Sequence, residues 1–275
     1  MQIAGRRIAL VGGEGSLPFL VKDALKTQGW HVFVLAYYNV TQKALTEEVP
    51  HVWLSLGRLQ ETLNILRHHH IQHIALVGKF YRPKLSALRP DALARKLLYR
   101  LGMSWFGDDA LLTTMLEFFQ ELGLTLVKTQ DILPGLLTEK GQIGRVLPHA
   151  QALEDIQRGA KILQHISCWD IGQGLAIQGS RVLGIEAAEG TDACITRCGV
   201  LAERGSLTRP PVYVKMAKKD QSRATDLPVV GLNTVYALSA AGFQGMGIEA
   251  HSVLVLDPPA FYTGVQEHGV FLWKF

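Results

Sequence analysis

The strongest constraint on the fold is a strand, a glycine loop and a helix at the start of the chain. Residues 7–11 are typical of a buried strand, and Gly12-Gly13-Glu14-Gly15-Ser16 follows as a turn. Residues 17–28 then carry apolar side chains at helical spacing, with Pro18 in the first turn. Further strands are expected at 30–36, 73–77 and 125–128, with helices at 58–69, 82–100 (two pieces) and 108–120. Because alternating strands and helices form parallel sheets, this part is predicted to be Rossmann-like.

The rhythm of the chain changes after Asp131, where Leu133-Pro134-Gly135 begins a glycine-containing connection. A length of 275 residues also favours two domains over one. We therefore expect an N-terminal domain over 1–131 and a C-terminal α/β domain with a mixed sheet over 132–275. Its predicted elements are helices at 150–166, 191–203 and 233–241, a hairpin of 172–178 and 181–187, and strands at 212–216, 247–250 and 253–256.

The composition excludes several classes of protein. The net charge is only +4, with 28 basic residues scattered among 24 acidic ones, so nucleic acid is not an expected partner. The three cysteines show neither a disulfide framework nor zinc-ligand spacing. We see neither a signal peptide nor an apolar run of membrane-spanning length, and we expect a cytoplasmic protein.

The glycine loop raises the alternative of an NAD(P)-dependent oxidoreductase, because backbone amides at a helix N-terminus bind phosphate. The dinucleotide pattern is incomplete here. Pro18 replaces its third glycine, and the second strand ends in Ala36-Tyr37-Tyr38 without the acidic residue that holds a ribose. Contact with substrate or a plain tight turn are the other interpretations of this loop.

Two segments of the second half combine acids with cations or a helix start. In the first, Glu186 lies near a strand end and Glu189, Thr191 and Asp192 surround the start of a helix, where anions are favoured. In the second, Lys215 ends a strand and Asp226 lies in the loop that follows. Cleavage of a pyrophosphate needs such a mixture, since cations neutralise phosphoryl oxygens while a carboxylate orients water or holds Mg²⁺. Helix capping and a solvated charged loop remain the structural alternatives.

The joint order of short motifs resembles the LpxI family across nearly the whole chain. These motifs are Gly12-Gly13-x-Gly15-x-Leu17-Pro18, Gly78-Lys79, Gly107-Asp108-Asp109, Leu133-Pro134-Gly135, Gly184-x-Glu186-x-x-Glu189-Gly190-Thr191-Asp192, Val214-Lys215 and Asp226-Leu227-Pro228-x-x-Gly231. The resemblance implies metal-dependent hydrolysis of UDP-2,3-diacylglucosamine to UMP and 2,3-diacylglucosamine 1-phosphate (lipid X) in lipid A biosynthesis. A non-catalytic protein that binds a nucleotide sugar or a lipid is the rival from another class.

The resemblance also implies roles for individual residues. Asp226, Asp192 and Glu189 are expected to be catalytic and to hold Mg²⁺ or Mn²⁺. The expected substrate contacts are Gly13, Gly15, Ser16, Leu17, Lys79, Asp109, Gly190, Thr191 and Lys215. The sequence departs from the expected pattern at Ser222, where we anticipated an acid. Peripheral contact with the inner membrane and formation of a homodimer are left open, and the run His68-His69-His70 is predicted to be structural.

Overall fold

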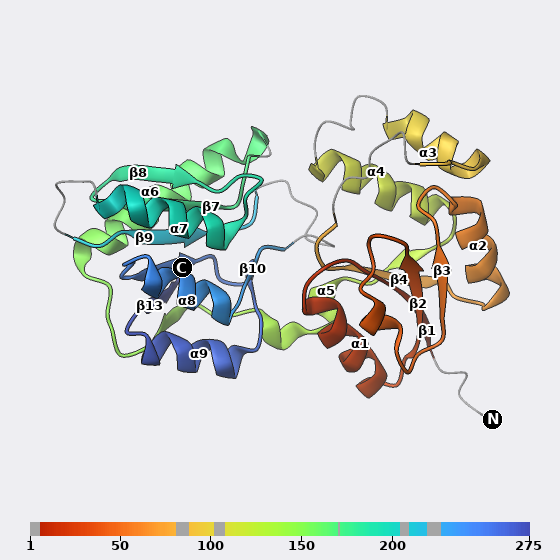
Figure 1. Ribbon diagram of the computed structural model, residues 1–275, viewed down its shortest axis with the longest axis horizontal. Helices are drawn as coiled ribbons and strands as arrows, with labels where there is room; N and C mark the ends of the chain where they lie inside the picture. The colour runs from red at the N-terminus through yellow and green to blue at the C-terminus, as the bar shows by residue number, and fades with distance from the viewer. Residues whose placement is uncertain (1–5, 81–87, 102–107, 170, 204–208, 219–226) are drawn as a thin grey trace. The chain divides into compact units, whose positions relative to one another are not determined.

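The computed structural model describes residues 6–80, 88–101, 108–169, 171–203, 209–218 and 227–275. Its internal contacts divide the chain into two compact units, Met1–Pro134 and Gly135–Phe275 (Figure 1). Each unit contains its own sheet, with helices packed on it.

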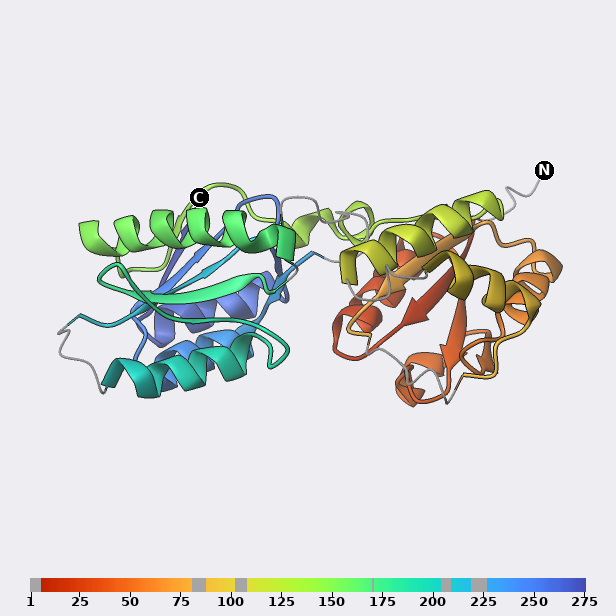
Figure 2. The ribbon, with the colours of Figure 1, turned by 90° about the horizontal axis from the view of Figure 1, so that it is seen from above.

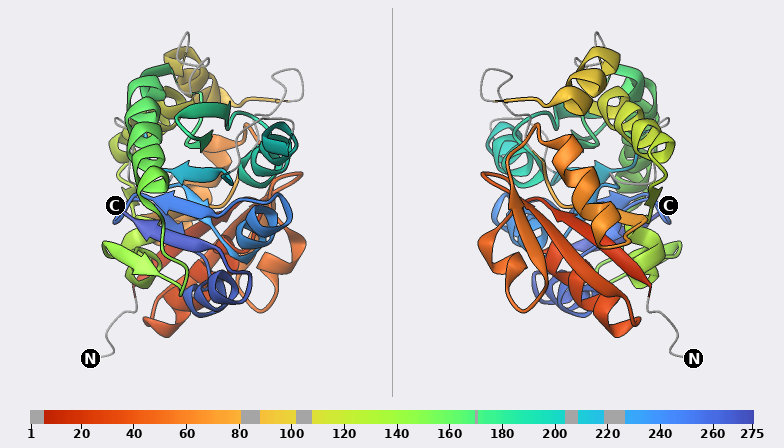
Figure 3. Two further views of the ribbon diagram at one scale, coloured as in Figure 1. Left: turned by 90° about the vertical axis from the view of Figure 1, so that its left-hand side faces the viewer. Right: turned by 90° about the vertical axis from the view of Figure 1, so that its right-hand side faces the viewer.

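The N-terminal unit is built on a five-stranded sheet in the order β3-β2-β1-β4-β5, with every neighbouring pair parallel (Figure 3, right). The strands are β1 (Arg7–Gly12), β2 (His31–Tyr37), β3 (His51–Leu54), β4 (His73–Val77) and β5 (Thr125–Leu126). Because β1 lies inside the sheet, its residues are buried from Ile8 onward and its carboxyl end carries the glycine loop.

Helices cover both faces of this sheet. α1 (Leu17–Thr27) packs on β1 and β2, whereas α2 (Leu59–His68), α3 (Ala92–Leu101) and α4 (Asp108–Glu121) share a core with the opposite side chains of the strands. Alternation along β1 explains the division, since Ala9 and Val11 belong to that core and Ile8 and Leu10 point the other way. The short α5 (Thr129–Ile132) contacts α1.

The C-terminal unit is built on a six-stranded mixed sheet in the order β6-β13-β11-β9-β7-β8. β9 (Val212–Lys215), β11 (Gly245–Ile248) and β13 (Phe271–Lys274) run parallel, and β6 (Gly141–Ile143), β7 (Gly174–Gln178) and β8 (Arg181–Ile185) pair in antiparallel fashion. β10 (Val229–Val230) and β12 (Leu254–Val255) form a separate parallel pair.

Two apolar layers enclose the second sheet. One face packs against α6 (Ala150–Ile166), and the other against α7 (Thr191–Glu203), α8 (Leu232–Ala240) and α9 (Pro258–Glu267), as Figure 2 shows. The α7 and α8 helices lie side by side. Asp155 of α6 holds the turn between β7 and β8 in place, because its carboxylate accepts hydrogen bonds from the N–H groups of Gly179 and Ser180 at 2.7 and 2.6 Å.

This architecture confirms the predicted fold class, a parallel α/β sheet followed by an α/β unit with a mixed sheet. The predicted strand at 253–256 was assigned to the wrong sheet, since only Leu254 and Val255 form a strand and they pair with β10. The elements that we did not expect include β3, α5, β6, β10, α9 and β13. β13 occupies an interior position, where a short apolar run suffices because neighbouring strands satisfy its backbone.

Candidate active site

A polar cluster lies at the end of β9, next to the start of β7 and the end of β8. Lys215 is the last residue of β9 and pairs with Gly174, the first residue of β7. The N–H of Glu186, one residue beyond β8, donates to the Gly174 carbonyl at 2.8 Å. The sheet therefore brings together residues 174, 186 and 215, which are far apart in the sequence.

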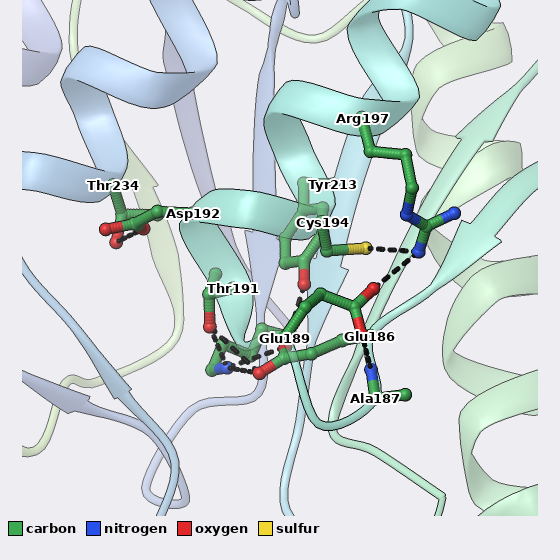
Figure 4. Close-up of polar contacts among 10 residues, drawn as sticks. Glu186, Ala187, Glu189, Thr191, Asp192, Cys194, Arg197, Tyr213 and Thr234 are labelled. Atoms are coloured by element: carbon green, nitrogen blue, oxygen red, sulfur yellow. Dashed lines mark hydrogen bonds and ion pairs between the residues drawn. The ribbon is translucent and has the colours of Figure 1, made fainter.

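The side chains of Lys215, Glu186, Thr191 and Tyr213 form a hydrogen-bonded network, and Figure 4 labels the last three. The Lys215 ammonium donates to Glu186 Oε2 at 3.0 Å and Oε1 at 3.3 Å, and to Thr191 Oγ1 at 2.6 Å. The Thr191 hydroxyl donates to Glu186 Oε1 at 3.1 Å. The Tyr213 hydroxyl donates to Glu186 Oε2 at 2.8 Å, so both carboxylate oxygens accept hydrogen bonds from two sides.

The network is shielded from water. The side chains of Lys215 and Glu186 are 3% and 12% exposed, and Tyr213 is fully buried. Burial, followed by the charge of Glu186, raises the pKa of Tyr213 well above its ordinary value. The tyrosine therefore stays protonated and remains a hydrogen-bond donor to the carboxylate.

Glycines make room for Glu186. A Cβ atom at Gly174 would overlap the Tyr213 hydroxyl and Glu186 Oε2, and one at Gly172 would overlap the Glu186 carbonyl oxygen. Any larger residue at position 174 would force the tyrosine and the carboxylate apart. Sequence reasoning missed Tyr213 and Gly174, and it gave Glu186 no role.

Glu189 lies outside this network. Its carboxylate pairs with Arg197 at 2.6 Å and accepts the N–H of Ala187 at 3.2 Å. The Arg197 guanidinium, assisted by backbone hydrogen bonds, holds the pKa of Glu189 below its usual value. Glu189 therefore carries its charge at neutral pH and is already matched by a cation.

Asp192 follows Thr191 in the first turn of α7 and is exposed. Its Oδ1 accepts the Thr234 hydroxyl of α8 at 2.9 Å, so it links the first turns of the two helices. Gly190 directly precedes α7 with a φ of +82°, a left-handed conformation that favours glycine.

The expected metal ligands are described only in part. Asp226 and Ser222 lie outside the described residues, and the Glu189 and Asp192 carboxylates contact different partners. Among the described residues, no three His, Cys, Asp or Glu side chains are placed to hold a metal ion. Within the histidine run, the His69 ring packs on Phe33 with ring centres 4.6 Å apart.

The glycine loop of the N-terminal unit is hydrogen-bonded to the backbone at the end of β4. Gly13 N–H donates to the Val77 carbonyl at 2.8 Å, and Glu14 exchanges hydrogen bonds with Lys79 at 2.9 and 3.0 Å. A Cβ atom at Gly13 would overlap the Lys79 carbonyl. The N–H groups of Gly13 and Glu14 are therefore already bonded to carbonyls at the end of β4.

The other predicted substrate contacts in this unit differ in position. Gln42 Nε2 donates to the Gly15 carbonyl at 2.8 Å, Ser16 precedes α1, and Leu17 is buried at the start of that helix. The side chain of Lys79 is exposed. Asp109 belongs to the first turn of α4, and its side chain lies outside the described part of the chain.

Fold and site together define a two-unit α/β protein with a buried carboxylate–lysine network beside a helix start. Family models match both units: the LpxI N-terminal domain matches residues 7–136, and the LpxI C-terminal domain matches residues 139–273. This chain therefore belongs to the LpxI family, as its motifs predicted. A curated relative from Caulobacter vibrioides, "UDP-2,3-diacylglucosamine pyrophosphatase LpxI", is 30% identical over 97% of this chain and 96% of its own.

Two solved structures align with less than half of the chain. The Bordetella bronchiseptica enzyme WbmG in complex with NAD is 14% identical, covers 46% of this chain and 37% of its own, and gives a TM-score of 0.30. The Thermus thermophilus UDP-glucose 4-epimerase complex with NAD is 21% identical, with coverages of 44% and 36% and a TM-score of 0.29. These similarities are too low to support a functional inference.

Proposed function

We propose that this chain hydrolyses the pyrophosphate bond of UDP-2,3-diacylglucosamine, releasing UMP and 2,3-diacylglucosamine 1-phosphate, in the cytoplasmic part of lipid A biosynthesis. The observation that carries the proposal is the match to the Caulobacter vibrioides pyrophosphatase over 97% of the chain. No helix among the described residues is long and apolar enough to cross a membrane. Because the proposed substrate carries acyl chains, we also propose peripheral contact with the inner membrane surface.

In this proposal, one group of residues promotes the attack of water and another stabilises the negative charge of the phosphates. Water attacks the sugar-side phosphorus, the bond from that phosphorus to the bridging oxygen breaks, and UMP leaves with this oxygen. Asp226 orients the water and accepts its proton. The start of α7, with Thr191 and the exposed Asp192, provides backbone N–H groups near the carboxyl ends of β9 and β11, an edge at which α/β sheets commonly bind ligands.

We also propose that the reaction requires a divalent ion, Mg²⁺ or Mn²⁺. When bound, such an ion neutralises phosphoryl oxygens. The described carboxylates do not form a complete site by themselves, since Glu189 is paired with Arg197 and Asp192 accepts from Thr234. Mg²⁺ is often held by one or two carboxylates together with substrate phosphates. Asp192 and Asp226 are therefore the residues that we propose to contribute.

The test is incubation of the purified chain with UDP-2,3-diacylglucosamine, with and without EDTA. We expect UMP and the sugar phosphate in a one-to-one ratio, and loss of both products with EDTA or in Asp226→Ala. The matched control is Asp131→Ala, which removes an exposed aspartate of α5 and should leave turnover unchanged. Binding of the substrate without any product would instead support the non-catalytic carrier.

Hydrolysis in ¹⁸O-labelled water tests which phosphorus is attacked. Attack on the sugar-side phosphorus places the label in 2,3-diacylglucosamine 1-phosphate. Label in UMP would contradict this part of the proposal while leaving the overall reaction intact.

A further inference from the structure

We propose that Glu186 is a positioning residue of the active site, and that the buried Lys215 is its counter-charge and not a direct phosphate contact. This inference rests on the proposed function. It assigns a role to a carboxylate that the sequence motifs left without one, and it changes the role expected for Lys215.

The hydrogen bonds of the Lys215 ammonium support its role as the counter-charge of Glu186. A lysine ammonium has three N–H donors. Three acceptor oxygens lie within hydrogen-bond distance of Lys215 Nζ: the two Glu186 oxygens at 3.0 and 3.3 Å and Thr191 Oγ1 at 2.6 Å. Since the side chain is only 3% exposed, a phosphate could reach it only if the network opened.

Glu186 acts on the reaction through the start of α7. Thr191 donates its hydroxyl proton to Glu186 Oε1 and accepts from Lys215, so its side chain is directed into the network. Thr191 is the first residue of α7, and Asp192 comes next. The carboxylate therefore sets where the N–H groups of this helix start and the Asp192 carboxylate lie.

The surroundings of Glu186 leave it little freedom. Tyr213 donates to Oε2 at 2.8 Å, the N–H of residue 186 is bonded to the Gly174 carbonyl at 2.8 Å, and Gly174 has no side chain because none would fit. Residues that are restrained in this way hold the reacting groups in productive geometry. Displacing a reacting group by about 1 Å can lower the rate on the order of a hundredfold.

The central experiment compares kcat and KM of Glu186→Gln, Lys215→Met and the double variant with the wild-type chain. We expect Glu186→Gln to lower kcat by about 10–100-fold while KM changes less than about threefold, because a mispositioned group affects the transition state more than substrate binding. If Lys215 acts only through Glu186, the double variant should be no slower than the slower single variant.

The control is Asp155→Asn, the same type of substitution at a buried carboxylate of the same unit. Asp155 is 3% exposed and binds the backbone of the β7–β8 turn, at the other end of β7 from Gly174. We expect it to lower the unfolding midpoint while kcat stays within about twofold of wild type. This separates loss of positioning from general loss of stability.

A second pair of variants keeps the test informative if Glu186→Gln folds poorly. Thr191→Val removes the hydroxyl that Glu186 orders, whereas Thr191→Ser keeps it. We expect Thr191→Ser to retain about tenfold more kcat than Thr191→Val.

Three outcomes would count against the inference or its basis. If the wild-type chain is active and Glu186→Gln has the same kcat, the positioning role is overturned but the proposed function is not. Direct phosphate contact by Lys215 would show as a higher KM in Lys215→Met alone. The effects of the two substitutions on KM would then multiply in the double variant. Absence of turnover in the wild-type chain would instead overturn the proposed function on which the inference rests.

Discussion

The ammonium of Lys215 lies 3.0 Å from Glu186 Oε2, and only 3% of the lysine side chain is exposed. Two opposite charges are thus removed from water together, at the carboxyl end of β9. Such a pair is costly to break from one side, because the remaining charge stays buried without its partner. Its energetic and functional roles can therefore be tested by substituting one partner at a time.

Lys215→Met should destabilise the chain by about 3–5 kcal/mol, since the Glu186 carboxylate stays buried and loses its counter-ion. Chemical denaturation followed by fluorescence measures the difference. Arg100→Met is the control, because Arg100 and Glu121 pair at 2.7 Å on the surface with 36% and 54% exposure. Its effect should be far smaller. Equal effects of the two substitutions would show that the buried pair has no special weight.

Gly174→Ala should destabilise the chain by about 1–3 kcal/mol, because the new methyl group overpacks the site between Tyr213 and Glu186. Catalysis should fall at the same time, since the contact that restrains Glu186 is displaced. The unfolding midpoint and kcat are the measurements. Gly135→Ala, where a Cβ would meet no atom within 4 Å, should leave the midpoint nearly unchanged. A tolerated Gly174→Ala would contradict the close packing of this site.

Tyr213 should make the stability of the chain fall at high pH. Its pKa is raised in the folded state, so it stays protonated there while the unfolded residue ionises at about pH 10. The stabilisation is complete below that pH and is lost as the pH rises towards the folded-state pKa. Unfolding free energies between about pH 8 and 11 should therefore decline less steeply in Tyr213→Phe than in wild type. Parallel curves would argue against a shifted tyrosine.

The thiols should differ in reactivity. Cys194 and Cys198 are buried, and a hydrogen bond with Cys198 together with burial raises the pKa of Cys194. Cys168 is exposed. A thiol reagent such as Ellman's should modify Cys168 rapidly in the native chain and reach the other two after denaturation. Cys168→Ser should then abolish the rapid phase, and its persistence would contradict the burial of the α7 cysteines.

Much of the architecture was predictable from local patterns. The strand, glycine loop and helix of residues 7–28 correspond to β1 and α1, and the predicted helix at 191–203 has the bounds of α7. The turn at Gly179-Ser180 was likewise predicted. The missed element β13 is four residues long, and nothing in so short a run distinguishes an interior strand from a buried loop.

The sequence by itself determined the two-part α/β organisation and the family, because hydrophobic periodicity and the order of short motifs can both be read along the chain. It also drew attention to Thr191 and Lys215. Only the tertiary structure decided which side chains meet. Strand pairing places Gly174, Glu186 and Lys215 next to one another, whereas Glu189, three residues from Glu186, is paired with Arg197 instead. Contacts between strands depend on register and on the space that glycine leaves, and neither property is local in the sequence.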